Sequence, residues 1–405
     1  MLYLAYEAQR AALLPARILA GITRSALDTL PADAADSRAA RTLSAGCELL
    51  MRADLTHRRP AFGIEDVRLG AATHDVVEEV VHEGEFGSLV HFRKVGAPAG
   101  PRVLVVAALA GHFATLLRDT VATLLPDHDV YITDWFNARD VPRDAGRFGL
   151  DDYIGFLIDW LEFLGPGTHV LGVCQPCPAA LAATAILAAQ GSDSVPRSLT
   201  LMAGPVDTRN NPTAVNELAT STPLSWFEEN AIFTVPLGHL GAGRRVYPGF
   251  LQVSAFVSMN LGRHVSQHLA LFQDLAAGRN EDAETIASFY DEYFAVLDLH
   301  ADYYLQTVDR VFMRHLLPKG DLTWRGEKVD TGAITRTALM TVEGERDDIC
   351  GLGQTMAAHD LCSNVPQARH RHHLQLGVGH YGVFSGRRWR HETYPIVRNF
   401  ILQND

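Results

Sequence analysis

Short β-branched, apolar runs alternate with helical patterns through the middle of this chain. The runs are RVLVVAAL (102–109), DVYITDW (129–135), GTHVLGV (167–173) and SLTLMAG (198–204). Strands of a parallel sheet that is covered on both faces read as nearly continuous apolar segments. A regular alternation of strands and helices is typical of such a sheet. The sequence therefore predicts an α/β fold with a mostly parallel sheet and helices on both of its faces.

Two other segments flank and interrupt this alternation. Residues 1–75 are expected to form an N-terminal helical segment packed on the core, since apolar residues recur at helical spacing near the start. Residues 206–336 carry long helical patterns rich in aromatic residues, and we interpret them as an inserted cap. The alternative is that they simply enlarge a helical core. Strand-like sequence returns at residue 337, so the core is expected to comprise residues 76–205 and 337–405.

Composition and charge exclude several classes of protein. The net charge of −12 argues against a nucleic-acid-binding surface, which needs concentrated Lys and Arg. No uncharged run is long enough to span a membrane, and the start of the chain does not resemble a signal peptide. Five scattered cysteines do not form the pattern of a secreted disulfide framework. A cytoplasmic protein is the resulting expectation.

A cysteine stands where an apolar strand passes into a small-residue helix. Gly172-Val173-Cys174-Gln175-Pro176 has the place and spacing of a nucleophile elbow, a sharp turn usually written G-x-S-x-G. Cysteine here replaces serine, and Pro176 replaces the second glycine, which the first turn of a helix tolerates. The positive end of the helix dipole favours the thiolate form of such a cysteine. Cys174 is therefore the candidate nucleophile.

Other interpretations of this cysteine remain open at the level of sequence. Cys174 could be a small buried apolar residue, which is common for intracellular cysteine. Together with Cys177 it could form a thioredoxin-like redox couple. A zinc site is disfavoured, because no second Cys or His pair has suitable spacing, although Cys350 and Cys362 could join in space. In the elbow interpretation Cys177 only packs inside the helix.

A cysteine nucleophile needs a base, and the base needs an orienting carboxylate. The chain order expected with an elbow is nucleophile, acid, histidine. Asp347 lies three residues after Gly344 at a strand end, with Asp348 as the alternative. His380 lies in a glycine-rich loop after the last strand. We therefore expect a triad of Cys174, Asp347 and His380; the cluster His370, His372 and His373 is interpreted as strand and surface, with a metal site as the alternative.

Donors for a developing oxyanion can also be assigned. One is the backbone N–H of the residue after the nucleophile, Gln175. The second is expected from the loop after residue 109, where Gly111 and His112 lie. His112 is equally well explained as a substrate contact or as a residue that starts a helix. Phe113 follows in the same loop and is a candidate substrate contact.

Several motifs together resemble the intracellular poly(3-hydroxybutyrate) depolymerases. They are MLYLAYE (1–7), AGHFATLLRDTV (110–121), VYITDWFNARDVP (130–142), GVCQP (172–176), LMAGPVDTRNNPTAVN (201–216), EGERDDICG (343–351) and GVGHYGVFSGRRW (377–389). The resemblance covers nearly the whole chain. It implies an α/β-hydrolase core with Cys174 as nucleophile, Asp347 as acid and His380 as base. DWFNARDVP also resembles polyhydroxyalkanoate synthases, but these carry glycine at the position of Pro176.

The resemblance implies hydrolysis of amorphous polyester through a thioester on the cysteine, without a cofactor or metal. The expected partner is the hydrophobic polymer granule in the cytoplasm, and a homodimer is left open. Trp226 and Phe227 of the aromatic-rich cap are candidate substrate contacts. The alternatives are transfer of the acyl group to a thiol such as coenzyme A, a synthase-like acyltransferase, and a granule-binding protein without catalysis.

Overall fold

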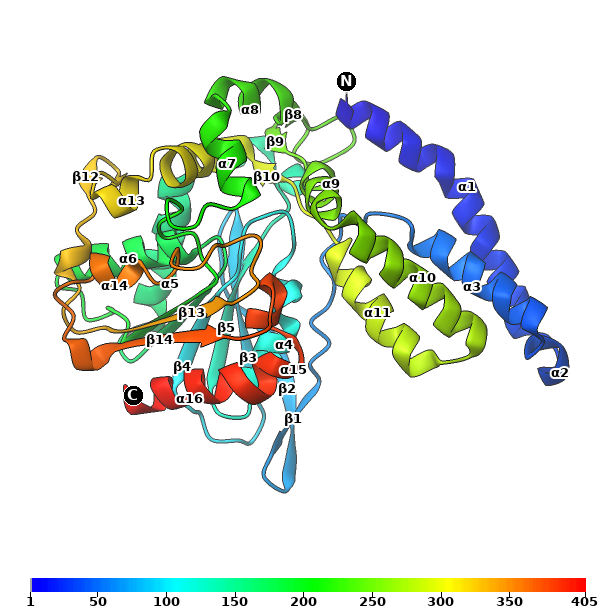
Figure 1. Cartoon of the computed structure of the whole chain (residues 1–405), viewed down its shortest axis with the longest axis horizontal. Helices are drawn as coiled ribbons and strands as arrows, with labels where there is room; N and C mark the ends of the chain where they lie inside the picture. Colours follow the sequence, from blue (N-terminus) through cyan, green and yellow to red (C-terminus); the bar gives the residue numbers. More distant parts are fainter. Residues whose placement is uncertain (1) are drawn as a thin grey trace.

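A nine-stranded sheet forms the centre of the computed structural model, which describes residues 2–405 (Figure 1). The strand order is β1-β2-β3-β5-β4-β6-β7-β13-β14. The pairings among β1, β2, β3 and β5 are antiparallel, and every pairing from β5 to β14 is parallel. The predicted α/β-hydrolase core with a mostly parallel sheet is confirmed.

The strands of this sheet are β1 (Asp66–Leu69), β2 (Ala72–Glu83), β3 (Gly87–Lys94), β4 (Arg102–Val106), β5 (Asp129–Trp135), β6 (His169–Val173), β7 (Ser198–Met202), β13 (Ala338–Gly344) and β14 (His370–Gln375). The helices around it are α4 (Arg118–Leu124), α5 (Leu150–Leu164), α6 (Cys177–Ala189), α14 (Ala358–Leu361), α15 (Gly386–Arg388) and α16 (Tyr394–Gln403).

Alternate side chains of the central strands pack into two separate hydrophobic cores, one on each face of the sheet. Leu104 and Leu199 pack with α5 and α6 on one face, whereas Val103 and Val105 pack with α4 and α16 on the other. Successive residues of a strand point to opposite faces, so a strand covered on both sides must be apolar at every position. This requirement explains why β4, β6, β7 and β13 could be predicted from their continuous apolar sequence.

The structure differs from the sequence prediction at the edge of the sheet. Strands begin at Asp66, inside the segment that was expected to be helical up to residue 75. β1 and the first half of β2 form a mostly exposed hairpin. An exposed edge hairpin needs few apolar residues, so it lacks the pattern that reveals a buried strand.

Residues 206–336 are mainly helical, as predicted, but also contain short strands. The helices are α7 (Ala214–Ser221), α8 (Leu224–Asn230), α9 (Gly249–Met259), α10 (Leu261–Ala277), α11 (Asn280–Tyr293), α12 (Ala301–Thr307) and α13 (Leu316–Lys319). The strands are β8 (Phe233–Thr234), β9 (Arg245–Tyr247), β10 (Leu299–His300), β11 (Thr323–Trp324) and β12 (Glu327–Lys328). Strands of two or three residues are too short to show the alternation of apolar and polar residues that predicts a strand.

Four helices project from the core as an arm (Figure 1). The N-terminal helices α1 (Leu2–Asp28) and α3 (Arg38–Arg52), joined by the short α2 (Ala32–Ala35), lie beside α10 and α11. α1 packs on α3, α3 on α10, and α10 on α11. None of the helices in the described residues is long and apolar enough to cross a membrane.

A buried hydrogen bond fastens the start of α1 to the segment before β10. The Tyr3 hydroxyl donates to Asp298 Oδ2 at 2.6 Å, and the Gly249 N–H donates to Asp298 Oδ1 at 2.9 Å. Asp298 is fully buried, and this burial raises the pKa of its carboxyl to about 6 although both hydrogen bonds oppose the rise. The hydroxyl of Tyr3 therefore satisfies an acceptor that has no access to water.

The substitution Tyr3→Phe should lower the free energy of unfolding by about 1–3 kcal/mol, because it leaves a buried carboxylate oxygen without its donor. Urea denaturation followed by circular dichroism measures this loss. An unfolding midpoint equal to that of the wild type would show that the bond does not contribute to stability.

Candidate functional site

Cys174 lies in a strained turn between β6 and α6. Its φ angle is +68°, in the left-handed region that non-glycine residues rarely adopt. Its N–H donates to the Met202 carbonyl of β7 at 2.8 Å, and its carbonyl accepts from the Cys177 N–H at 3.2 Å. Strained backbone of this kind is found at nucleophile elbows, where the turn pushes one side chain out of the sheet. The geometry is that of the predicted elbow.

Close packing behind the turn involves the second cysteine. A Cβ atom on Gly204 would lie 2.1 Å from Cys177 Sγ and 2.8 Å from the Cys174 carbonyl oxygen, so only glycine fits there. Cys177 Sγ is fully buried and donates to the Gly172 carbonyl at 3.3 Å. Burial raises the pKa of the Cys177 thiol. Both thiols are free, and Cys177 contacts the strands behind the turn rather than the cavity.

His380 connects the candidate nucleophile to the candidate acid. Its Nε2 lies 3.1 Å from Cys174 Sγ, and its Nδ1 lies 2.8 Å from Asp347 Oδ2. His380 begins the 3-10 helix His380–Val383 after β14, and Asp347 follows the end of β13. The three residues predicted from motif order are therefore brought together by the ends of three parallel strands.

Two neighbouring carboxylates after β13 have different surroundings. Asp347 Oδ1 accepts the backbone N–H groups of Ile349 and Cys350, both at 2.9 Å, which leaves Oδ2 directed at His380. Asp348 instead accepts from Asn260 Nδ2 at 2.9 Å. The structure thus places Asp347, and not the alternative Asp348, beside the imidazole.

The charge of His380 follows from its surroundings. Burial by itself would lower the pKa of the imidazole, but the charges of Cys174 and Asp347 and the hydrogen bonds to both residues raise that pKa well above its ordinary value. The raised pKa favours the protonated imidazole, which places positive charge next to Cys174 Sγ. An adjacent positive charge favours a thiolate.

Hydrogen bonds tie the loop after β4 to β5, to α5 and to the elbow. The Ala107 N–H donates to Thr133 Oγ1, and the Ala107 carbonyl accepts from Trp135 Nε1 and the Tyr153 hydroxyl. The side chain of Gln175 accepts the Leu109 N–H at 3.4 Å through Oε1. Sequence reasoning assigned only the backbone of Gln175 a role, and its side chain now also fixes this loop.

Gln175 further connects the elbow to the helical insertion. Its Nε2 donates to the hydroxyl of Tyr303 in α12, which is fully buried and stacked on Tyr153 with ring centroids 5.1 Å apart. Within the described part of the chain, the backbone N–H of Gln175 has no acceptor. This N–H is thus free to bind an oxyanion.

Gly111 and His112 lie in the same loop. Gly111 has a φ angle of +92°, and a Cβ atom there would lie 2.6 Å from Gln252 Cγ. His112 is buried and donates from Nε2 to the Tyr293 carbonyl at 3.1 Å. Burial lowers the pKa of His112 to about 4, so the ring is neutral. His112 therefore anchors the loop to α11 while one side of its ring faces the cavity.

A cavity of about 50 Å³ adjoins Cys174 and His380. Its remaining lining residues are largely apolar: Ala107, Ala108, Ala110, His112, Phe113, Ala114, Leu116, Leu117, Val173, Phe256, Ile349, Tyr381 and Phe384. Phe113 is thus at the cavity, whereas Trp226 and Phe227 on α8 are not among the lining residues. The abundance of aromatics in the insertion did not indicate which of them, such as Phe256, would face the cavity.

The described residues contain no group of three or more His, Cys, Asp or Glu side chains that could hold a metal ion. His370 instead bonds through Nδ1 to His359 Nδ1 at 2.7 Å, and His372 bonds to Thr341 Oγ1. These contacts tie β13 and β14 together beside α14.

Comparison with known proteins adds a family match. Residues 203–405 match the family described as PHB de-polymerase C-terminus. The structure is similar to the α/β hydrolase GrgF from a Penicillium species (14% identity, TM-score 0.43, covering 82% of this chain and 98% of that one). It is also similar to 2-hydroxy-6-oxo-6-phenylhexa-2,4-dienoate hydrolase from Rhodococcus (12% identity, TM-score 0.41, 82% and 99%). No curated protein sequence matches the chain.

Iodoacetamide should alkylate Cys174 before any other cysteine at pH 6–7, because the other four are buried and Cys174 lies against the His380 ring, whose raised pKa favours its protonated form. His380→Ala should slow this alkylation at least about tenfold by removing the charge that favours the thiolate. Peptide mass spectrometry over time measures the rate, with His391→Ala on the surface as control. An unchanged rate in His380→Ala would contradict the proposed ion pair.

Proposed function

Since the chain belongs to the PHB depolymerase family and is a carboxylic-ester hydrolase, we propose that it hydrolyses amorphous poly(3-hydroxybutyrate) through Cys174, His380 and Asp347. The observation that supports this proposal is the pair of contacts made by His380, from its Nε2 to Cys174 Sγ at 3.1 Å and from its Nδ1 to Asp347 Oδ2 at 2.8 Å. A cysteine whose only role was to pack in the core would not need an imidazole oriented in this way.

Acylation begins when the Cys174 thiolate attacks an ester carbonyl of the polymer. The carbonyl oxygen becomes an oxyanion, which accepts the N–H of Gln175 and an N–H from the Ala110–His112 loop. His380 then gives its Nε2 proton to the leaving hydroxyl of the next monomer unit. The C–O bond breaks and a thioester remains on Cys174. Asp347 holds the ring in the required orientation throughout.

Deacylation uses the same residues in reverse roles. Neutral His380 removes a proton from water, whose oxygen attacks the thioester carbonyl. The C–S bond breaks, the acid is released and the cysteine thiolate is restored beside the imidazolium. The cavity at the sulfur is small, so we further propose that residues 206–336 act as a cap that moves when a polymer segment enters.

Cys174→Ala should reduce release of 3-hydroxybutyrate from amorphous polymer particles by at least about a thousandfold, because no thioester can form. Cys177→Ala should change the rate by less than about tenfold, since this sulfur only packs. Enzymatic determination of soluble 3-hydroxybutyrate measures both. Equal losses in the two variants would favour a redox couple, and full activity of Cys174→Ala would refute the nucleophile.

The two neighbouring aspartates provide a matched pair of variants. Asp347→Asn should lower kcat for a soluble butyrate ester by about a hundredfold or more, because the amide can no longer orient and charge-stabilise the imidazolium. Asp348→Asn should stay near the wild type, because among the described residues the Asp348 side chain bonds to Asn260 and not to His380. Steady-state kinetics on both variants decide whether Asp347 or Asp348 is the acid. The reverse order of effects would reassign the acid.

A further inference from the structure

The outer helix of the arm, α1, has the opposite orientation from an ordinary surface helix. Before its last residue, its charged residues are Glu7, Arg10, Arg17 and Arg24. Each of them faces other parts of the protein. Arg10 and Arg17 pair with Asp54, Arg24 pairs with Glu48, and Glu7 lies 3.5 Å from Arg139.

The side of α1 that faces solvent is uncharged up to Asp28 and mostly apolar, with Gln9 and Ser25 as its exposed polar residues. Its large exposed side chains are Leu4, Leu13, Leu14, Ile18, Leu19 and Ile22. Ile18, Leu19 and Ile22 are 54%, 63% and 62% exposed. At 100° per residue, the exposed uncharged positions span roughly 260° of the helix circumference. A helix that turns its charged residues inward and a mostly apolar, uncharged side outward is expected to have that outer side covered in use.

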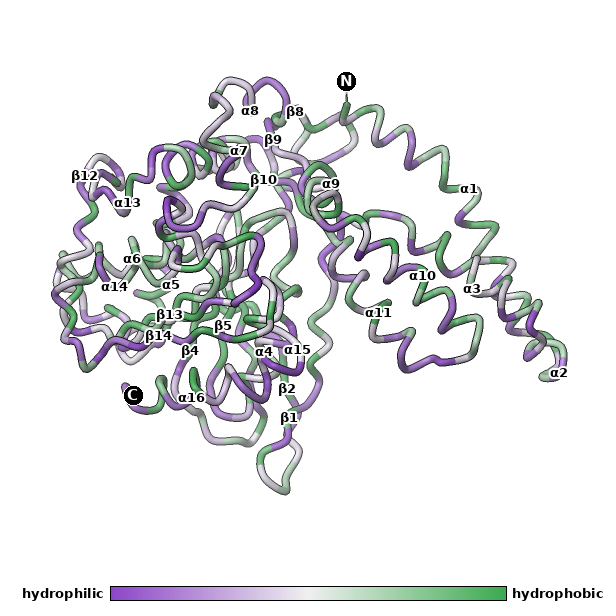
Figure 2. Tube along the Cα trace, in the orientation of Figure 1, coloured by the Kyte–Doolittle hydropathy of each residue, from purple (hydrophilic) through white to green (hydrophobic). Residues whose placement is uncertain are grey.

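The arm is only one helix thick. α1, α3, α10 and α11 lie side by side, each contacting the next, so no second layer covers them (Figure 1). Domains normally bury apolar helix faces between two layers. These four helices hold fewer than a fifth of the residues, yet they carry half of the large apolar side chains that are exposed in the described chain. Figure 2 shows green, hydrophobic segments interspersed with purple, hydrophilic ones along α1 and α10.

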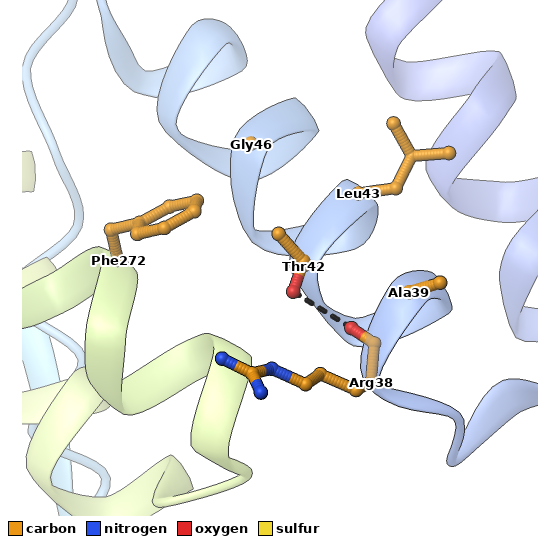
Figure 3. Close-up of a pocket in the computed structure, with 6 residues that line it drawn as sticks. All are labelled: Arg38, Ala39, Thr42, Leu43, Gly46 and Phe272. Carbon is orange, nitrogen blue, oxygen red and sulfur yellow. Dashed lines mark hydrogen bonds between the residues drawn. The ribbon is translucent and has the colours of Figure 1, made fainter.

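An apolar track runs along the arm from the catalytic cavity. Phe256 of α9 lines the cavity at Cys174, and the next residue, Val257, lines an outer groove with Leu261, Val265 and Leu269. Phe272 of α10 lies in that groove and also in a shallow hollow on α3, which Arg38 and Thr42 line as well. Figure 3 shows Phe272 directed across this hollow toward Gly46, with Leu43 on the side of α1. The groove on α10 and the cavity share no lining residue, but they meet at consecutive residues of α9.

We propose that the arm is the docking surface for the solid polyester, with the outward face of α1 and the track on α10 laid against the polymer; this rests on the proposed function. The polymer is uncharged and offers a continuous apolar phase, which matches an uncharged face that covers most of the helix circumference. Docking there places the polymer beside α9, whose Phe256 lines the cavity at Cys174.

Charge and breadth favour this occupant over two others. Helices that bind anionic lipid present Lys and Arg toward the surface, whereas the arginines of α1 are turned inward and the chain carries a net charge of −12. A second copy of the chain would pack one helix against another, and such a contact covers a stripe of only about 100°. Most of the apolar arc would then stay exposed.

The test uses full-length protein with Cys174→Ala, so that polymer is bound and not consumed. Sedimentation with amorphous poly(3-hydroxybutyrate) particles should show at least about tenfold weaker binding for Ile18→Glu/Ile22→Glu, and a similar loss for Val265→Glu/Leu269→Glu. The control pair Ile396→Glu/Leu402→Glu replaces two exposed aliphatic residues on α16 of the core, 41% and 48% exposed, and should bind normally. With an active Cys174, the α1 pair should still hydrolyse p-nitrophenyl butyrate at the wild-type rate.

Polymer binding unchanged in both arm variants would overturn the proposal. The proposal would also fail if light scattering showed a wild-type dimer that Ile18→Glu/Ile22→Glu converts to monomers while polymer binding stays intact. Binding to phosphatidylcholine vesicles instead of polyester would overturn it as well. If arm-dependent binding occurs but the active enzyme releases no 3-hydroxybutyrate, the proposed function fails and the docking surface stands. If the enzyme hydrolyses polymer but binding does not depend on the arm, the docking surface fails and the proposed function stands.

Discussion

The strained backbone at Cys174 is the constraint on which the rest of the site depends. A left-handed residue between β6 and α6 projects the sulfur beyond the sheet, where the loops after β13 and β14 can reach it. The cost of this conformation, on the order of 1–3 kcal/mol, is offset by close packing that needs glycine at 204 and a small, buried thiol at 177. The chemistry proposed for the sulfur is therefore built on packing beneath it.

Much of this arrangement was predictable from sequence, because it follows from requirements on the order of residues along the chain. A buried strand must be apolar throughout, and β5 was predicted with its observed bounds, Asp129–Trp135. The acid and the histidine were expected at the ends of later strands, and parallel strands bring those ends to one edge. The contact between His380 and Asp347 is the direct result of this topology.

Contacts between distant segments could not be predicted in the same way. Nothing local indicates that Gln175 bonds to Tyr303, 128 residues later, or that Phe256 rather than Trp226 faces the cavity. The orientation of α1 was also hidden, since an amphipathic pattern does not say which side faces solvent. The helical spacing near the N-terminus was real, but its apolar side turned outward because α3 and its loop supply Glu48 and Asp54 for the arginines.

The proposed docking of a solid substrate combines a broad, mostly apolar surface on the arm with a narrow, largely apolar cavity at Cys174. The central claim is that the polymer's acyl group passes through Cys174. Mass spectrometry of the protein trapped with a slowly hydrolysed 3-hydroxybutyrate ester measures this directly. The account predicts one added acyl group on the peptide that contains Cys174. An adduct on another residue, or none during turnover, would contradict it.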